Sequence, residues 1–129
     1  MKSTLRSLFF IPLYLRIFTN RMELTRLDEQ GDAVTLERSF SSVRMLIHDY
    51  EAAENAAQEA IGQLFAGHPK LKPKNISIMV QPMELLEGGL SGLEERALLE
   101  IGYGAGANTV LLTDVDVDQA VAIKQLSAA

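Results

Sequence analysis

The sequence contains no cysteine among its 129 residues. This absence excludes disulfide frameworks, thiolate metal sites and cysteine nucleophiles. It also fits a reducing compartment, where proteins do without disulfides, so we expect a cytoplasmic location.

Basic residues are scarce as well. Twelve lysines and arginines stand against 17 aspartates and glutamates, which gives a formal net charge of −5 and a pI near 5.0. Nucleic-acid binding needs a concentrated basic surface, so we expect no nucleic-acid partner. Apolar residues make up 47% of the chain, enough for a core of ordinary size. The length is that of one domain, and we predict a single domain over residues 1–129.

Long hydrophobic runs are absent too. The N-terminal run Leu8–Leu15 is far shorter than the roughly 20 apolar residues of a membrane span. It follows basic residues as in a signal peptide, but no small-residue cleavage site follows it. We interpret it as a buried strand. The alternative is a weak peripheral contact with the inner membrane, made by a leader that includes a flexible segment over residues 1–7. Its candidate contact residues are Lys2, Leu5, Arg6, Leu8 and Phe9.

The first third of the chain has the patterning of β-strands. Residues 8–19, 21–29 and 34–47 are three candidate strands, the third broken around residues 39–42. Short turns join them, which implies antiparallel pairing.

The remainder alternates helices and strands. We predict helices over residues 50–65, 91–101 and 117–126, and strands over residues 76–80 and 109–112. Capping residues precede the helices: Asp49, Ser91 with Glu94, and Asp114 or Asp116. Both strands are nearly all apolar and are expected in the sheet interior.

This order, β-β-β-α-β-α-β-α, predicts an α/β fold with a mixed five-stranded sheet and helices on both faces. Right-handed crossovers fix most of the remaining topology. The order is ribonuclease-H-like and is shared by the lobes of actin and Hsp70.

Two neighbouring stretches, Glu94–Glu100 and Gly104–Leu112, resemble the MreB-type bacterial actins. In that family a helix that begins with an acidic–Arg pair leads through a Gly-Ala-Gly-Ala turn into an apolar strand. The motif is confined to residues 94–112, whereas the order of elements agrees over nearly the whole chain. The resemblance implies a bacterial protein built like the first actin lobe alone.

The same resemblance implies a degenerate nucleotide site. The family's first hairpin carries an Asp-x-Gly-Thr phosphate loop, in which the aspartate organises a metal and the glycine admits phosphate. Here Arg16 stands in the place of the aspartate and Phe18 in that of the glycine. Asp114 keeps an acid after the last strand, but the proline that follows in the family is lost. We therefore expect no nucleotide and no cofactor.

Clustered carboxylates raise the alternative of a nuclease. Residues Glu84, Glu87, Asp114 and Asp116 could gather at strand ends and bind magnesium, as in two-metal nucleases. The first carboxylate of such a site comes from the middle of the first strand, where this chain has Arg16. We expect no metal site and no catalytic residue.

Two further motifs fail their spacing tests. A calcium loop that starts at Asp114 needs glycine at its sixth and glutamate at its twelfth position, which are Gln119 and Gln125. The aspartates at 114, 116 and 118 are better explained as helix-capping residues. The glycine-rich stretch 102–106 closes a helix instead of opening one, so it is a helix end and not a dinucleotide fingerprint.

Five arginines lie in the predicted three-strand region: Arg16, Arg21, Arg26, Arg38 and Arg44. Alternation would place several on one sheet face, a candidate interaction surface for an acidic partner or lipid headgroups. The alternative is a solvated face whose arginines pair with Glu23, Asp28 and Glu37 across strands.

From these features we expect a non-enzymatic, actin-like module that binds a protein partner in cell shape, division or envelope assembly. One alternative is a homo-oligomeric structural or regulatory domain unrelated to the cytoskeleton, associating through an exposed edge strand. The other alternative is the carboxylate-dependent nuclease.

Overall fold

The computed structural model describes residues 10–28, 33–66, 75–85 and 89–129. Five strands lie in these residues: β1 (Ile11–Phe18), β2 (Arg21–Arg26), β3 (Ala33–Glu37), β4 (Ile76–Pro82) and β5 (Thr109–Leu112). The helices are α2 (Tyr50–Ala66), α3 (Gly92–Gly104) and α4 (Gln119–Ala128).

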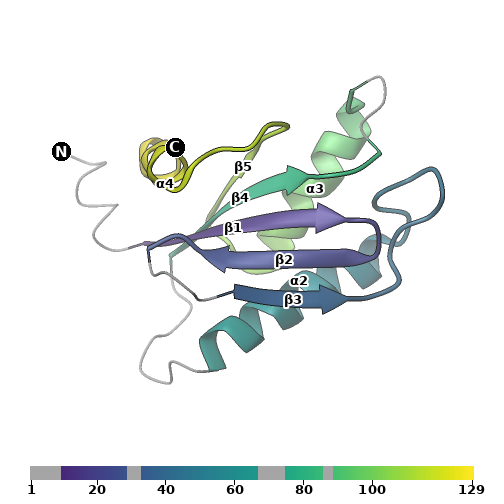
Figure 1. Ribbon diagram of the computed structural model, residues 1–129, viewed down its shortest axis with the longest axis horizontal. Helices are drawn as coiled ribbons and strands as arrows, with labels where there is room; N and C mark the ends of the chain where they lie inside the picture. The colour runs from purple at the N-terminus through teal and green to yellow at the C-terminus, as the bar shows by residue number, and fades with distance from the viewer. Residues whose placement is uncertain (1–9, 29–32, 67–74, 86–88) are drawn as a thin grey trace.

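The strands form one mixed sheet in the order β3-β2-β1-β4-β5 (Figure 1). The first three pair antiparallel, as their tight connections predicted. Strand β4 returns parallel to β1, and β5 lies parallel to β4. The register places Leu15 beside Leu24 on one side and Val80 on the other. The prediction of a mixed five-stranded α/β sheet is confirmed.

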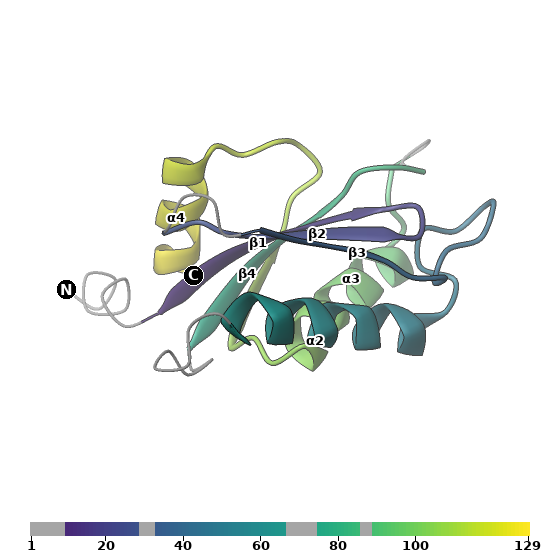
Figure 2. The same cartoon turned by 60° about the horizontal axis from the view of Figure 1, so that its bottom comes forward.

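Helices cover both faces of this sheet, with α2 and α3 on one face and α4 on the other (Figure 2). Alternation along β1 explains the two cores. Leu13, Leu15 and Ile17 enter the large core beneath α2 and α3, whereas Tyr14 enters the small core beneath α4. Strand β4 lies between β1 and β5, and all seven of its residues are buried. Its predicted interior position is confirmed.

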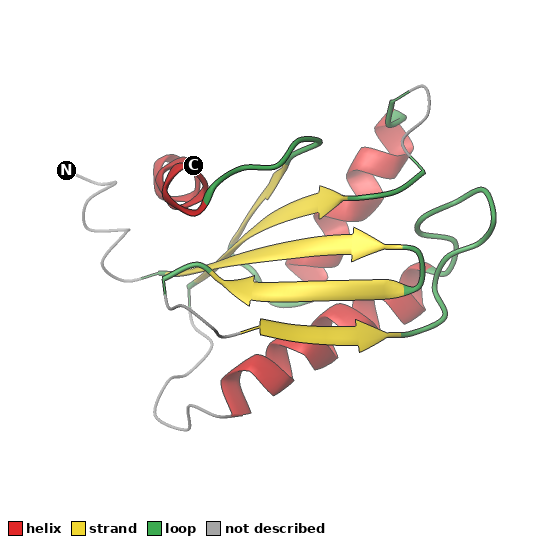
Figure 3. Ribbon diagram, viewed as in Figure 1, coloured by secondary structure: helices red, strands yellow, loops and turns green. Residues whose placement is uncertain are grey.

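The predicted third strand is too long. Strand β3 ends at Glu37, and residues 38–49 form a loop, here called the 38–49 loop (Figure 3). Its backbone is held without a strand ladder: Asn20 Oδ1 accepts from the N–H groups of Phe40 (2.9 Å) and Ser41 (2.7 Å), and the Phe40 carbonyl accepts from the N–H of His48 (2.8 Å). Short polar side chains compete with regular pairing in this way.

The prediction that β5 is an interior strand is wrong. In the described sheet β5 lies at the edge, and Leu111 and Leu112 are only half-buried. After β5 the chain crosses to the opposite face as α4 instead of returning as a further strand. Apolar composition therefore overstated the burial of this strand.

The helix starts match the capping signals, with one exception. Asp49 accepts from the N–H of Ala52 at α2, and Ser91 and Glu94 form a reciprocal capping box at α3. Helix α4 is capped by Asp118 and not by Asp114 or Asp116. Asp116 instead accepts a hydrogen bond from Gln81 Nε2 on β4 at 3.1 Å, so its carboxylate contacts the sheet and does not cap the helix.

Candidate functional site

A groove lies between the 38–49 loop, the connector after β4 and the start of α3; we call it the apolar groove. The loop contributes Met45, Leu46 and Ile47. The connector and α3 contribute Leu85, Leu90, Leu93, Ala97 and Leu98, with two carboxylates, Glu84 and Glu94, among them. Its empty volume is about 470 Å³, part of it open to solvent.

The floor and the rim of the apolar groove differ in exposure. Leu46 and Leu98 are buried and form the floor, which continues into the large core. At the rim Leu93 is 78% exposed, Met45 44% and Leu85 40%. Val43, beside the rim in the same loop, is 93% exposed. Seven large apolar side chains are exposed in the described part of the chain, and three of the seven line this groove.

The loop wall of the apolar groove is held in place by hydrogen bonds. The Ser42 hydroxyl accepts from the N–H groups of Arg44 (3.3 Å) and Met45 (3.0 Å). The Ser41 hydroxyl donates to the Leu46 carbonyl at 2.5 Å. Phe40, which is 1% exposed, anchors the loop in the core. The wall is therefore formed before any partner binds.

The two carboxylates of the apolar groove are fixed by backbone N–H groups. Glu84 Oε2 accepts from the N–H of Thr19 at 2.5 Å, and hydrogen bonds from the Thr19 side chain and backbone lower the pKa of Glu84 below its ordinary value. Glu94 Oε1 accepts from the N–H of Ser91 at 3.1 Å as its half of the capping box. Both groups therefore hold a defined position beside the apolar surface.

A second hollow adjoins the apolar groove at Leu90, which lines both; we call it the acidic end. It is lined by Gly89, Leu90, Glu95, Leu112 and Asp114. The described lining residues of the two hollows thus carry four carboxylates and no lysine, arginine or histidine. The site therefore offers apolar contact and negative charge together.

Only Arg16 and Arg21 of the five candidate arginines share a sheet face, and Arg21 also lines a shallow hollow together with Arg38. Arg16 and Arg21 lie on the sheet face that carries α4, with their guanidinium groups 4.0 Å from the ring centres of Tyr14 and Phe18. Arg21 also lies 3.6 Å from Glu23.

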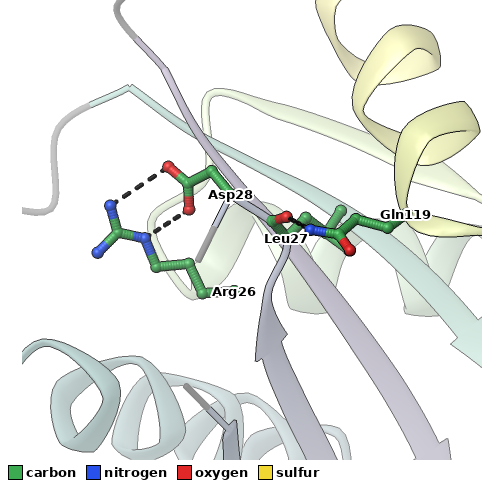
Figure 4. A network of polar contacts seen from close by, with 4 residues as sticks. All are labelled: Arg26, Leu27, Asp28 and Gln119. Carbon is green, nitrogen blue, oxygen red and sulfur yellow. Dashed lines mark hydrogen bonds and ion pairs between the residues drawn. The ribbon is translucent and has the colours of Figure 1, made fainter. Parts of the chain in front are cut away.

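The other three candidate arginines lie elsewhere. Arg26 is buried on the opposite sheet face and makes two hydrogen bonds, of 2.6 and 3.2 Å, to Asp28 (Figure 4). Beside this pair, Gln119 donates to the Leu27 carbonyl and ties α4 to the end of β2. Arg38 pairs with Glu59 on α2, and Arg44 is exposed in the 38–49 loop. The five arginines therefore form no single surface.

The candidate nuclease carboxylates serve different parts of the fold. Glu84 binds the Thr19 N–H, Asp114 lines the acidic end, and Glu87 lies outside the described residues. Asp116 belongs to a polar chain in which the Tyr14 hydroxyl donates to Gln81 Oε1 at 2.5 Å. In the residues that the structure describes, no group of three His, Cys, Asp or Glu side chains could hold a metal ion.

The membrane leader, with Lys2, Leu5, Arg6, Leu8 and Phe9, lies outside the described residues. Its proposed contact with lipid stays a prediction. None of the helices in the described ranges is long and apolar enough to cross a membrane.

A curated relative places the chain in a family. The uncharacterized protein YjaA of Escherichia coli (strain K12) is 35% identical over 96 residues, which cover 72% of this chain and 75% of that protein. The chain belongs to the YjaA family. No model of a known protein family matches the chain.

Membership of the YjaA family corrects the resemblance to MreB-type actins, which is wrong. Neither the relative nor any family model connects the chain with actins. Residues 94–112 have a local explanation, because Glu94 completes a helix cap and Gly102 allows α3 to approach Val110 of β5. The interpretation of Arg16 and Phe18 as replacements in a phosphate loop loses its basis. That the chain binds no nucleotide stays a prediction.

The sequence patterns do not predict the apolar groove, because apolar residues that they place in a strand and in a helix are exposed in the structure. Val43 and Met45 were assigned to a strand, where alternate side chains are buried, whereas they lie exposed in a loop. Leu93 follows the capping Ser91 in the first turn of α3 and is exposed, although the apolar residues of a helix commonly face the core.

Proposed function

We propose that this YjaA-family chain is a non-enzymatic interaction module and that the apolar groove binds a segment of a partner protein. One observation carries the proposal: exposed Leu93, Met45 and Leu85 surround a preformed groove with a buried apolar floor. Contiguous exposed apolar surface of this kind is typical of interaction sites. The expectation of a partner in cell shape, division or envelope assembly depended on the resemblance to actins and is not part of this proposal.

The size of the groove sets the expected strength. Fully burying a large apolar side chain is worth about 1.5–3 kcal/mol, and the three rim residues are already partly buried, so covering them gives a gross gain of roughly 2–5 kcal/mol. Association costs several kcal/mol or more in lost freedom of motion. The small balance between the gain from burial and the cost of association favours a weak, reversible complex instead of a permanent one.

We also propose that the sheet is ribonuclease-H-like. The order β3-β2-β1-β4-β5, with three antiparallel strands followed by two parallel ones, supports this assignment. A nuclease activity has no similar support, since the described candidate carboxylates are divided between a sheet contact, made by Asp116, and the two hollows.

Self-association is a second candidate function. The edge strand β5 is apolar, uncharged and free of proline, and such an edge invites pairing with another chain. Four residues give a short edge, which favours the groove as the stronger site. A dimer in sedimentation that Leu93→Asp leaves intact would support self-association through β5.

Selection from a random peptide library displayed on phage tests the groove. Wild type is compared with Leu93→Asp, which adds an acid to the first turn of α3, where the helix dipole favours it. The matched control is Val121→Asp, at an exposed position in the first turn of α4. We expect families of peptides that bind wild type and Val121→Asp and that lose binding to Leu93→Asp at least tenfold. Peptides that bind all three equally, or no enrichment at all, would contradict the proposed groove function.

A further inference from the structure

The apolar groove and the acidic end share the lining residue Leu90 and differ in chemistry. A chain that leaves the apolar groove at Leu90 therefore enters the acidic end, which Glu95 and Asp114 line. An occupant of the groove therefore meets apolar side chains first and carboxylates next.

The carboxylates at the acidic end are available to a partner. Glu95 and Asp114 are exposed, and neither side chain has a hydrogen-bond or ion-pair partner among the described residues. The neighbouring cation Arg96 is engaged with Glu100 at 3.3 Å. Arg44 lies in the 38–49 loop but does not line either hollow.

The carboxylates inside the apolar groove add to the same charge without being free. Glu84 and Glu94 are held by backbone N–H groups, which satisfy part of their hydrogen-bonding capacity. They keep their negative charge beside the apolar rim. An acidic partner segment would be repelled along the whole surface, and a neutral one would leave four carboxylates without a counter-charge.

We propose that the partner segment carries two or three apolar side chains followed by lysine or arginine, with the basic group seated between Glu95 and Asp114. This inference rests on the proposed function of the apolar groove and adds the chemistry of its occupant. Charge complementarity at the rim of an interface mainly sets specificity and the rate of association. Because the acidic end is exposed, its contribution falls as salt rises.

The test begins with the peptides selected on the wild-type chain. Each is synthesised as selected and with every lysine and arginine replaced by glutamine, and its affinity is measured by fluorescence anisotropy at low and high salt. The protein variant is Glu95→Gln/Asp114→Asn. The matched control, Glu37→Gln/Glu51→Gln, removes the same charge from exposed positions on β3 and α2.

We expect lysine or arginine to be enriched beside the apolar positions of the selected peptides. Glu95→Gln/Asp114→Asn and the glutamine peptides should each weaken binding at least fivefold at low salt, and the difference should shrink at high salt. The control should stay within twofold of wild type.

Three results would overturn the inference. Peptides that need Leu93 but lack basic residues, or that are indifferent to Glu95→Gln/Asp114→Asn, would leave the groove function standing and refute the basic partner. Absence of any peptide sensitive to Leu93→Asp would refute both. A dimer in sedimentation that Leu93→Asp disperses would assign the groove to a second copy of the chain.

Discussion

Two helical glycines should respond in opposite ways to the same substitution. Gly62 lies on the exposed side of α2, and a Cβ atom added there meets nothing within 4 Å. Gly102 lies in the last turn of α3 against β5, and a Cβ added there would lie 2.7 and 2.8 Å from the two methyl groups of Val110. The pair tests the close approach of α3 to the sheet.

The magnitudes follow from helix propensity and packing. Alanine is better than glycine in a helix by about 1 kcal/mol, so Gly62→Ala should raise the free energy of unfolding by about that amount. The Gly102 distances fall well below the roughly 3.5–4.0 Å of a favourable carbon contact. Overpacking costs typically about 1–3 kcal/mol. The free energy of unfolding of Gly102→Ala should therefore be lower than that of Gly62→Ala by about 1–3 kcal/mol.

Urea denaturation followed by circular dichroism measures both variants on one scale. The double variant Gly102→Ala/Val110→Ala is the internal control. It should be more stable than the sum of the single changes by at least about 0.5 kcal/mol, as expected for residues in contact. If Gly102→Ala proves as stable as Gly62→Ala, then α3 does not pack on β5 at this distance, and the local explanation of residues 94–112 fails.

Two further predictions concern tyrosine hydroxyl groups, that of half-buried Tyr50 and that of buried Tyr14. Burial and a hydrogen bond to Glu54 raise the pKa of Tyr50 from 10.0 to about 12. The stability that this provides is fully present below pH 10 and is lost as pH rises toward 12; urea denaturation across this range should show the decline, and Tyr50→Phe should flatten it. Tyr14→Phe should lower the free energy of unfolding by about 1–3 kcal/mol, because Gln81 Oε1 loses its buried donor. An unchanged free energy in Tyr14→Phe would show that water replaces that donor.

The parts of the fold that could be predicted from sequence rest on local rules. The capping box at Ser91 and Glu94 and the cap at Asp49 mark helix starts by hydrogen bonds within four residues, so the sequence alone reveals them. Short turns between the first three strands imply antiparallel pairs for the same reason. The order β-β-β-α-β-α-β-α then predicts the mixed sheet, because the last two strands return through helices.

The wrong predictions concern the end of β3 and the cap of α4, where a residue distant in the sequence makes the deciding hydrogen bond. Strand β3 stops at Glu37 because Asn20, on the preceding hairpin, holds the N–H groups of Phe40 and Ser41. Asp116 fails to cap α4 because Gln81 on β4 donates to it. No pattern within a window of neighbouring residues contains either partner, and the sequence alone does not choose between capping aspartates spaced two apart.

The candidate site depends on distant residues even more strongly. Its wall, floor and rim come from the 38–49 loop, the connector after β4 and α3, and the acidic end adds Asp114 after β5. The resemblance to actins drew attention to residues 94–112 as a nucleotide-related motif. In the structure the same stretch contributes Ala97 and Leu98 to the apolar groove and a tight helix–strand contact.

Binding and stability are separable at this groove, which makes its function testable. Leu93 is 78% exposed, so it contributes little to the core, and surface substitutions usually change the free energy of unfolding by less than about 0.5 kcal/mol. Leu98, one turn further along α3, is 2% exposed, and its truncation would cost about 2–5 kcal/mol. Loss of peptide binding in Leu93→Asp at unchanged stability would therefore report on the rim alone. The same loss in Leu98→Ala would not distinguish a damaged site from a damaged fold.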